Sequence, residues 1–189
     1  MARKAKLLIG LTAFAACQSA AANPIYYDCD TPGAKYSEIK FNQSQPDHRV
    51  RGTITPMELR PHDWRPAATV YLESQDKRHT AAVQLVNSEG TILDVAVSVG
   101  WNGQITKTVI GQMRNTHSIA FDLYMPSSGQ GFAEVGGKRV PLKFSIGPNA
   151  KVSVTCSSGH FRFDPLDWDW EQLPGTSPGA NNSIPSAPR

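Results

Sequence analysis

Apolar and polar residues alternate along much of this sequence, and this alternation constrains the fold more than any other feature. Residues 92–99 show it clearly, and similar runs span 119–125, 139–146 and 151–156. A period of two is typical of β-strands with one buried face, whereas an amphipathic helix repeats about every 3.6 residues. No comparable helical pattern appears after residue 22. We therefore expect an all-β domain, with Cys156 on the buried face of its strand.

Short glycine-containing turns connect these runs. Asn102-Gly103 and Gly136-Gly137 are pairs that tolerate the positive φ angles of tight hairpins. Successive hairpins build antiparallel sheets, and roughly ten strands with one apolar face each hide those faces by stacking as two sheets. The sequence thus predicts an antiparallel two-sheet β-sandwich of jelly-roll or lectin-like kind, with a closed β-barrel as the alternative. Pro141 indicates an edge or a bulge, because proline cannot donate to the hydrogen-bond ladder.

Residues 1–22 have the three-part layout of a secretory signal peptide. Arg3, Lys4 and Lys6 form a positive start, an apolar run follows, and alanines then offer a signal-peptidase site after Ala22. The run is far shorter than the roughly 20 apolar residues of a membrane-spanning helix, and no later segment reaches that length. We expect the signal helix to be cleaved and the mature protein to be extracytoplasmic, either periplasmic or secreted.

Cys17 opens a second processing route. Phe14-Ala15-Ala16-Cys17 resembles the lipobox of bacterial lipoproteins, although leucine is usual where this chain has Phe14. Lipidation of Cys17 would make the protein a lipid-anchored envelope lipoprotein. Both routes place the domain outside the cytoplasm.

The charge balance argues against a nucleic-acid partner. The chain has 19 Lys and Arg residues and 16 Asp and Glu residues, and three of the cations lie in the expected signal peptide. The expected mature chain therefore has 16 of each and no formal net charge. Proteins that bind nucleic acids neutralise phosphates with clustered cations, and this sequence has no run of Lys and Arg.

The cysteines predict one disulfide. Once Cys17 is removed or lipidated, Cys29 and Cys156 are left, and two thiols in an oxidising compartment are expected to pair. On the chain-entropy model, a bridge that closes so long a loop stabilises the fold by roughly 5 kcal/mol. No Cys-x-x-Cys or His-x-Cys spacing supports a metal site, so no metal or cofactor is predicted. The five histidines are scattered, and we expect them on the surface.

Composition divides the chain into three parts. After the signal peptide, the β-sandwich domain is expected over 23–164, and a disordered tail rich in Pro, Gly, Ser and Asn over 165–189. Trp168 and Trp170 lie among acidic residues at the start of this tail. We interpret them either as side chains that pack back onto the domain or as part of an exposed peptide that docks a partner.

Two common catalytic motifs are absent from the sequence. It has no His-Glu-x-x-His metal helix and no Glu-x-Asp-x-x-Glu strand of paired carboxylates. Glu73, Asp94, Asp122 and Glu134 alternate with apolar residues, so we expect them on the solvent faces of their strands. No catalytic residue is assigned, although a site assembled across strands would leave no local motif.

Residues 60–66 form the strongest candidate for a ligand loop. Between two prolines, which hold φ near −65° and stiffen the chain, lie His62, Asp63, Trp64 and Arg65. Trp64 would offer a platform for a sugar ring or an apolar side chain, and its neighbours would form hydrogen bonds. The alternative is a rigid connector whose tryptophan caps the core. Trp101 is open to the same two interpretations.

Three functions fit these features. The first is an exported, non-catalytic binding module of the cell envelope or periplasm, with a carbohydrate or an envelope protein as its ligand. The second is an enzyme that acts on envelope polysaccharide or peptide, and the third is a structural subunit of an envelope complex. Because a β-sandwich supports many functions, the function has to be inferred from the residues of the site. A cluster of acids or histidines with shifted pKa values would favour the enzyme, and an aromatic platform without one would favour binding.

Overall fold

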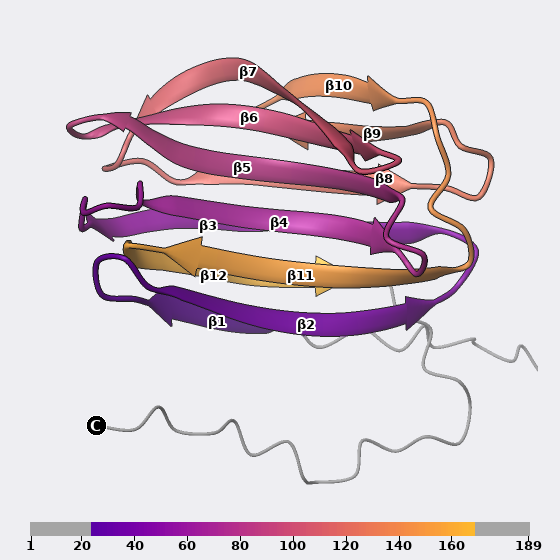
Figure 1. Ribbon diagram of the computed structural model, residues 1–189, viewed down its shortest axis with the longest axis horizontal. Helices are drawn as coiled ribbons and strands as arrows, with labels where there is room; N and C mark the ends of the chain where they lie inside the picture. Colours follow the sequence, from indigo (N-terminus) through magenta and orange to yellow (C-terminus); the bar gives the residue numbers. More distant parts are fainter. Residues whose placement is uncertain (1–23, 169–189) are drawn as a thin grey trace, which may run out of the picture.

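A computed structural model describes residues 24–168, which form twelve strands and no helix (Figure 1). Sheet 1 contains, in spatial order, β1 (Ile25–Asp30), β12 (Gly159–Trp168), β3 (His48–Leu59), β8 (Ile119–Met125), β9 (Gly131–Val135) and β10 (Lys138–Leu142). Sheet 2 contains β2 (Tyr36–Ser44), β11 (Asn149–Ser157), β4 (Ala67–Ser74), β5 (His79–Glu89), β6 (Ile92–Trp101) and β7 (Gln104–Arg114). The neighbouring strands pair antiparallel, and Figure 1 shows the sheets stacked as two layers.

The predicted two-sheet β-sandwich is confirmed, and the alternative of a closed barrel is wrong. Each sheet ends in two edge strands, β1 and β10 in sheet 1 and β2 and β7 in sheet 2. The last two strands of the chain return to its beginning. β12 lies between β1 and β3, and β11 lies between β2 and β4. These long-range pairings bring residues far apart in the sequence side by side.

The core lies between the sheets and is built from the alternating apolar residues. In sheet 2, Val70, Val83 and Val97 are paired across β4, β5 and β6, and all three are buried. Ile54 and Leu123 of sheet 1 belong to the same core cluster and are fully buried. Each such side chain contributes about 1.5–3 kcal/mol on burial, so the alternation is the main source of stability.

The predicted turns are confirmed by the backbone angles. Asn102 and Gly103 have φ angles of 49° and 81°, and Gly136 and Gly137 have 56° and 77°. Both residues of each pair therefore adopt the left-handed conformation of a type I′ hairpin. Pro141 lies on β10, which is an edge strand as expected.

Two sequence expectations are wrong in detail. The run 139–146 was expected to be one strand, but β10 ends at Leu142, because the chain then crosses from sheet 1 to β11 of sheet 2. Phe144 and Ile146 of the crossing are nevertheless buried. His48 was expected on the surface and is fully buried at the start of β3, where its Nε2 lies 2.8 Å from the carbonyl oxygen of Gly147.

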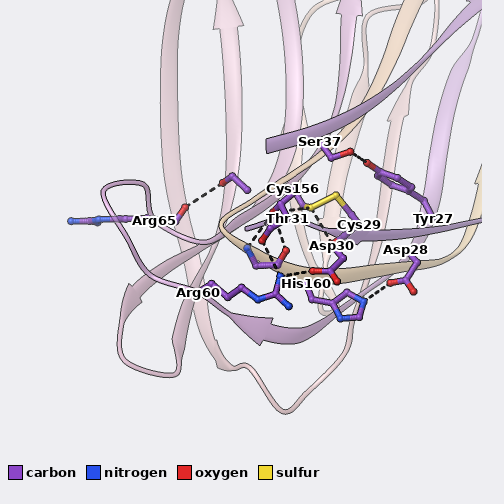
Figure 2. Close-up of a disulfide and its surroundings, with 12 residues drawn as sticks. Tyr27, Asp28, Cys29, Asp30, Thr31, Ser37, Arg60, Arg65, Cys156 and His160 are labelled. Atoms are coloured by element: carbon purple, nitrogen blue, oxygen red, sulfur yellow. Dashed lines mark hydrogen bonds and ion pairs between the residues drawn. A yellow bond between two sulfur atoms is a disulfide. The ribbon is translucent and has the colours of Figure 1, made fainter. Parts of the chain in front are cut away.

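The predicted disulfide is present and joins the two sheets. Cys29 on β1 and Cys156 on β11 are both buried, with 6.2 Å between their Cα atoms. Figure 2 shows the bridge beside Thr31, whose hydroxyl donates to the carbonyl oxygen of Gly159 over 3.0 Å. Near it, Tyr27 and Ser37 form a hydrogen bond of 2.7 Å between a strand of each sheet.

The ends of the sandwich differ from the expected boundaries or lie outside the described residues. β12 runs to Trp168, past the boundary expected after residue 164, and the backbone of Pro165 lies against Gly52 of β3. The expected signal peptide, Trp170 and the rest of the expected tail lie outside residues 24–168. Within that range, no helix has the length and apolarity to cross a membrane.

Candidate functional site

The outer face of sheet 1 is covered by ion pairs between its own side chains. Four of them link adjacent strands, namely Arg49–Asp122, Arg51–Asp167, Arg139–Glu134 and His160–Asp28. In addition, Arg60, just after β3, binds Asp30 of β1 and Glu58 of β3. Figure 2 shows the Arg60–Asp30 and His160–Asp28 contacts near the disulfide. These charged groups bind one another, as expected for a face that is turned to solvent.

The outer face of sheet 2 carries a groove of about 360 Å³. Small residues of the neighbouring strands β5 and β6 make room for it, namely Thr80, Ala82, Ser98 and Gly100. Larger side chains border it, namely Tyr71, Glu73, Gln84 and Ile105. Tyr71, Ala82 and Ser98 are paired across β4, β5 and β6, so the groove crosses the strands. Its lining is mainly uncharged and polar.

Tyr71 and Glu38 form the main polar contact beside the groove. The Tyr71 hydroxyl donates a hydrogen bond of 2.9 Å to Oε1 of Glu38, which also binds the ammonium of Lys40. Burial, and then the neighbouring Glu38 carboxylate, raise the pKa of Tyr71. Partial burial alone would raise the pKa of Glu38, but hydrogen bonds from Lys40 and Tyr71 outweigh it and lower that pKa. Tyr71 is therefore protonated and Glu38 charged at neutral pH.

Gln84 and Ser98 add a second polar contact on the groove's lining. The Ser98 hydroxyl donates to Oε1 of Gln84 over 2.9 Å. The Gln84 carboxamide is thereby oriented through its oxygen, and its NH₂ group is the part left to donate to a ligand. Together with the Tyr71 hydroxyl, it gives the groove oriented donors and acceptors on strands rather than on loops.

The predicted ligand loop lies at one end of this face. His62, Asp63, Trp64 and Arg65 are all exposed on the loop between β3 and β4. The Trp64 ring, 48% exposed, lies 6.4 Å from the ring of Tyr36, which is 64% exposed. Tyr36 begins β2 on the outer face of sheet 2, because its neighbour Ser37 is paired with inward-facing Cys156. The two exposed rings, the Tyr36–Trp64 pair, therefore adjoin the face that carries the groove.

Trp101 lies at the opposite end of the sandwich. It ends β6 and is paired with His79 at the start of β5, whereas the Trp64 loop leads into the first residue of β4. Its ring, 53% exposed, lies 4.4 Å from His79 and 6.2 Å from Phe144, both in edge-on arrangements. Trp101 thus covers that end of the core, and the structure does not bring it together with Trp64.

A hollow of about 530 Å³ lies beside this end, between the β4–β5 turn and residues 145–149. Asp76 borders it, and its carboxylate accepts from the Ser74 hydroxyl over 2.6 Å and from the Arg78 amide over 3.0 Å. These bonds tie Asp76 to its own turn. No group of three or more metal-ligating side chains occurs among the described residues.

No motif in the sequence marks the groove residues as a site. Alternation placed Glu73 on a solvent face correctly, and it implied the same for Tyr71 and Gln84. It carried no signal that would place Tyr71 next to Glu38, because the two strands meet through β11, which is late in the sequence.

Comparisons with known proteins identify the fold. No protein-family model and no curated protein matches the sequence. An alginate lyase from Alteromonas sp. 272 is similar in structure, with a TM-score of 0.55 and 11% identity over 78% of this chain and 88% of that one. So is the potassium-bound carbohydrate recognition domain of Emp46p, with a TM-score of 0.51 and 7% identity over 78% and 89%. A CBM2 module of the evolved Dit of Lactobacillus casei BL23 phage J-1 has a TM-score of 0.50 and 7% identity over 70% and 68%. At these identities the similarity establishes a jelly-roll β-sandwich and nothing further.

Proposed function

We propose that this protein is a non-catalytic carbohydrate-binding module that acts outside the cytoplasm and holds its sugar on the outer face of sheet 2. The observation that carries the proposal is the groove across the strands, lined by oriented polar side chains and bordered by Tyr71. A sugar presents hydroxyl groups around a ring with apolar faces. A groove with fixed donors and acceptors and an aromatic border suits that chemistry.

Two further observations support a carbohydrate ligand. The exposed Tyr36–Trp64 pair adjoins the same face and offers apolar ring surface to a sugar. In addition, the solved structures that share the fold include a carbohydrate recognition domain, a CBM2 module and an alginate lyase. Because the fold supports many functions, these neighbours serve as support by analogy only.

The pKa shifts beside the groove favour binding over catalysis. A general acid or base works best with a pKa near the working pH. The pKa of Tyr71 is raised and that of Glu38 is lowered, so both move away from neutrality. The same shifts keep the Tyr71 hydroxyl and the Glu38 carboxylate in one protonation state, which suits hydrogen bonding to a ligand.

Location outside the cytoplasm rests on the leader sequence together with the disulfide. Residues 1–22 match a secretory signal, and the Cys29–Cys156 bridge is typical of proteins made in an oxidising compartment. We propose cleavage after Ala22, with lipidation at Cys17 as the alternative. Mass spectrometry of the N-terminus of the exported protein separates the two.

The binding proposal is tested by screening the purified exported protein on a glycan array and measuring Kd for the best glycan by calorimetry. Replacing Tyr71 by Ala should weaken binding about tenfold or more, the effect of roughly 1.4 kcal/mol. The matched control is Tyr124→Ala on the outer face of sheet 1, which should leave Kd unchanged. Equal Kd values for the wild type and Tyr71→Ala would contradict the proposed site. Release of reducing ends from the glycan would favour the enzyme alternative instead.

Binding of a protein remains the alternative ligand class. Partner docking through Trp168 and Trp170 would make the protein a subunit of an envelope complex. Co-purification of a defined envelope protein that is lost when the chain ends at Asp167, with no glycan bound, would support that alternative.

A further inference from the structure

We infer that the ligand of this face is an uncharged polysaccharide chain that crosses all of sheet 2, from Ile105 on β7 to the Tyr36–Trp64 pair beside β2. The inference deepens the proposed function and rests on it. It specifies the charge of the glycan, its direction on the sheet and the role of Trp64.

The charges on the outer face of sheet 2 cancel. The pairing of the strands places four carboxylates and four cations on it, namely Glu38, Glu73, Glu89 and Asp94 with Lys40, Lys107, Arg114 and Lys151. Lys40 binds Glu38, and Lys151 lies 3.8 Å from Glu73. Asp94 accepts a hydrogen bond of 2.9 Å from Gln112. The face therefore presents no net charge to a ligand.

The carboxylates beside the groove disfavour an anionic ligand. Glu73 borders the groove, and Glu38 binds Tyr71 beside it. The lowered pKa of Glu38 keeps that group negative throughout the neutral range. A uronate chain would approach these charges and would compete with them for Lys40 and Lys151. A neutral chain meets only hydrogen-bonding groups and apolar surface.

Two cations of this face, Lys107 and Arg114, differ from Lys40 and Lys151 in their lack of an ion-pair partner within residues 24–168. Among the residues that the structure describes, neither has a carboxylate within ion-pair distance, and both lie on the edge strand β7. Lys107 belongs to the same cross-strand row as Ser98 and Ala82. It is therefore the cation that an anionic chain in the groove would use, and a neutral chain does not need it.

The direction of the chain follows from the register of the strands. Ile105 is paired with Gly100 on β6, at the Trp101 end of the face, and it is 72% exposed. Tyr71 belongs to the next outward-facing row of paired residues, one step from the Ile105 row toward the Trp64 end of the face. Tyr36 lies at the far end on the far edge strand, beside Trp64. The exposed Ile105, the half-buried Tyr71 and the exposed Tyr36–Trp64 pair thus follow a diagonal across the face, with the groove along its first part. Six strands at about 4.8 Å spacing span roughly 24 Å, which calls for a chain rather than a single sugar.

The charge of the ligand is tested by calorimetry with the exported protein, using xylan, mannan and cello-oligosaccharides as neutral probes and alginate and polygalacturonate as anionic ones. We expect a neutral glycan to bind, with a Kd that changes less than about twofold between 50 and 500 mM NaCl, since no counterions are released. Lys107→Gln should leave that Kd unchanged. Tight, salt-sensitive binding of alginate or polygalacturonate that Lys107→Gln weakens would overturn this inference and leave the carbohydrate proposal intact. Failure of every glycan to bind would overturn both.

The diagonal path of the chain across sheet 2 is tested with oligosaccharides of different lengths. Trp64→Ala should weaken binding of the longest oligosaccharide of the bound glycan about fivefold or more and leave its disaccharide unaffected. The matched control is Tyr26→Ala, an exposed aromatic on β1 of sheet 1, which should change neither. Equal binding of the longest oligosaccharide by the wild type and Trp64→Ala would overturn the diagonal path, as would an equal loss at every length.

Discussion

Cys29 and Cys156 are separated by 127 positions in the sequence, yet their disulfide joins the first strand of sheet 1 to β11 of sheet 2. The bridge is buried in the core at the end of the sandwich where the Trp64 loop also lies. Cys29 lies on the edge strand β1, and β11 is next to the edge strand β2. Each of these edge strands is paired with a neighbour on one side only. The bridge therefore ties together the beginning and the end of the domain.

Removing this bridge should destabilise the domain strongly. The double variant Cys29→Ala/Cys156→Ala should lose roughly 3–5 kcal/mol of unfolding free energy, because the unfolded chain is no longer closed into a long loop. Urea unfolding followed by tryptophan fluorescence measures the loss. Mass spectrometry of the exported wild type should show two more mass units after reduction. Alkylation of both thiols without reductant would refute the bridge.

The burial of His48 should make stability depend on pH. Desolvation lowers the pKa of His48 in the folded state, despite a hydrogen bond to Gly147 and the nearby Asp47 charge. Below about pH 6.5, the unfolded chain therefore binds a proton that the folded chain does not, so stability falls as the pH drops through this range.

The measurement is the unfolding free energy in urea at pH 7.5 and pH 5.0. The decrease between the two should be smaller in His48→Gln than in the wild type. His117→Gln, at an exposed turn position, serves as the control and should keep the wild-type decrease. An identical decrease in all three proteins would show that His48 does not carry the effect.

Gly52 should not tolerate a side chain. A Cβ atom at Gly52 would lie 2.3 Å from the carbonyl oxygen of Pro165, which is backbone and cannot move aside locally. We expect Gly52→Ala to cost about 1–3 kcal/mol, as overpacking does. The matched control is Gly111→Ala, where the Cβ would meet only the ammonium of the Lys138 side chain, at 3.4 Å. Equal melting temperatures for the two variants would mean that β12 does not pack on β3 at Pro165.

Trp64 and Trp101 should differ in their effects on stability. Trp101 contacts His79 and Phe144 over the end of the core, so Trp101→Ala should lower the unfolding free energy by about 1 kcal/mol or more. Trp64 lies on an exposed loop against Tyr36, so Trp64→Ala should change it by less than about 0.5 kcal/mol. Thermal melts of the two variants check the order. A larger loss for Trp64→Ala would show that its loop stabilises the domain rather than serving a ligand.

Alternation in the sequence predicted the parts of this protein that depend on local geometry. Side chains of a strand point to opposite faces in turn, so the inward position of Cys156 and the outward positions of Glu73 and Asp94 could be inferred. Positive φ angles at Asn102-Gly103 and Gly136-Gly137 followed from residue type for the same local reason. His48 was mispredicted because its burial depends on Gly147 and Gln43, which reach it only through the connector to β11 and the β2–β3 turn.

The candidate site depends on pairing between distant strands. Tyr71 meets Glu38 because β11, formed more than 70 residues later in the chain, lies between their strands and sets their register. Ala82, Ser98 and Gly100 form a groove only once β5 and β6 lie side by side between larger neighbours. Residue order alone was enough to predict the strands, the buried face of each and the one bridge that closes the domain. Strand order was decided by the tertiary structure, because many registers satisfy the same alternation and only the packing of both sheets selects one.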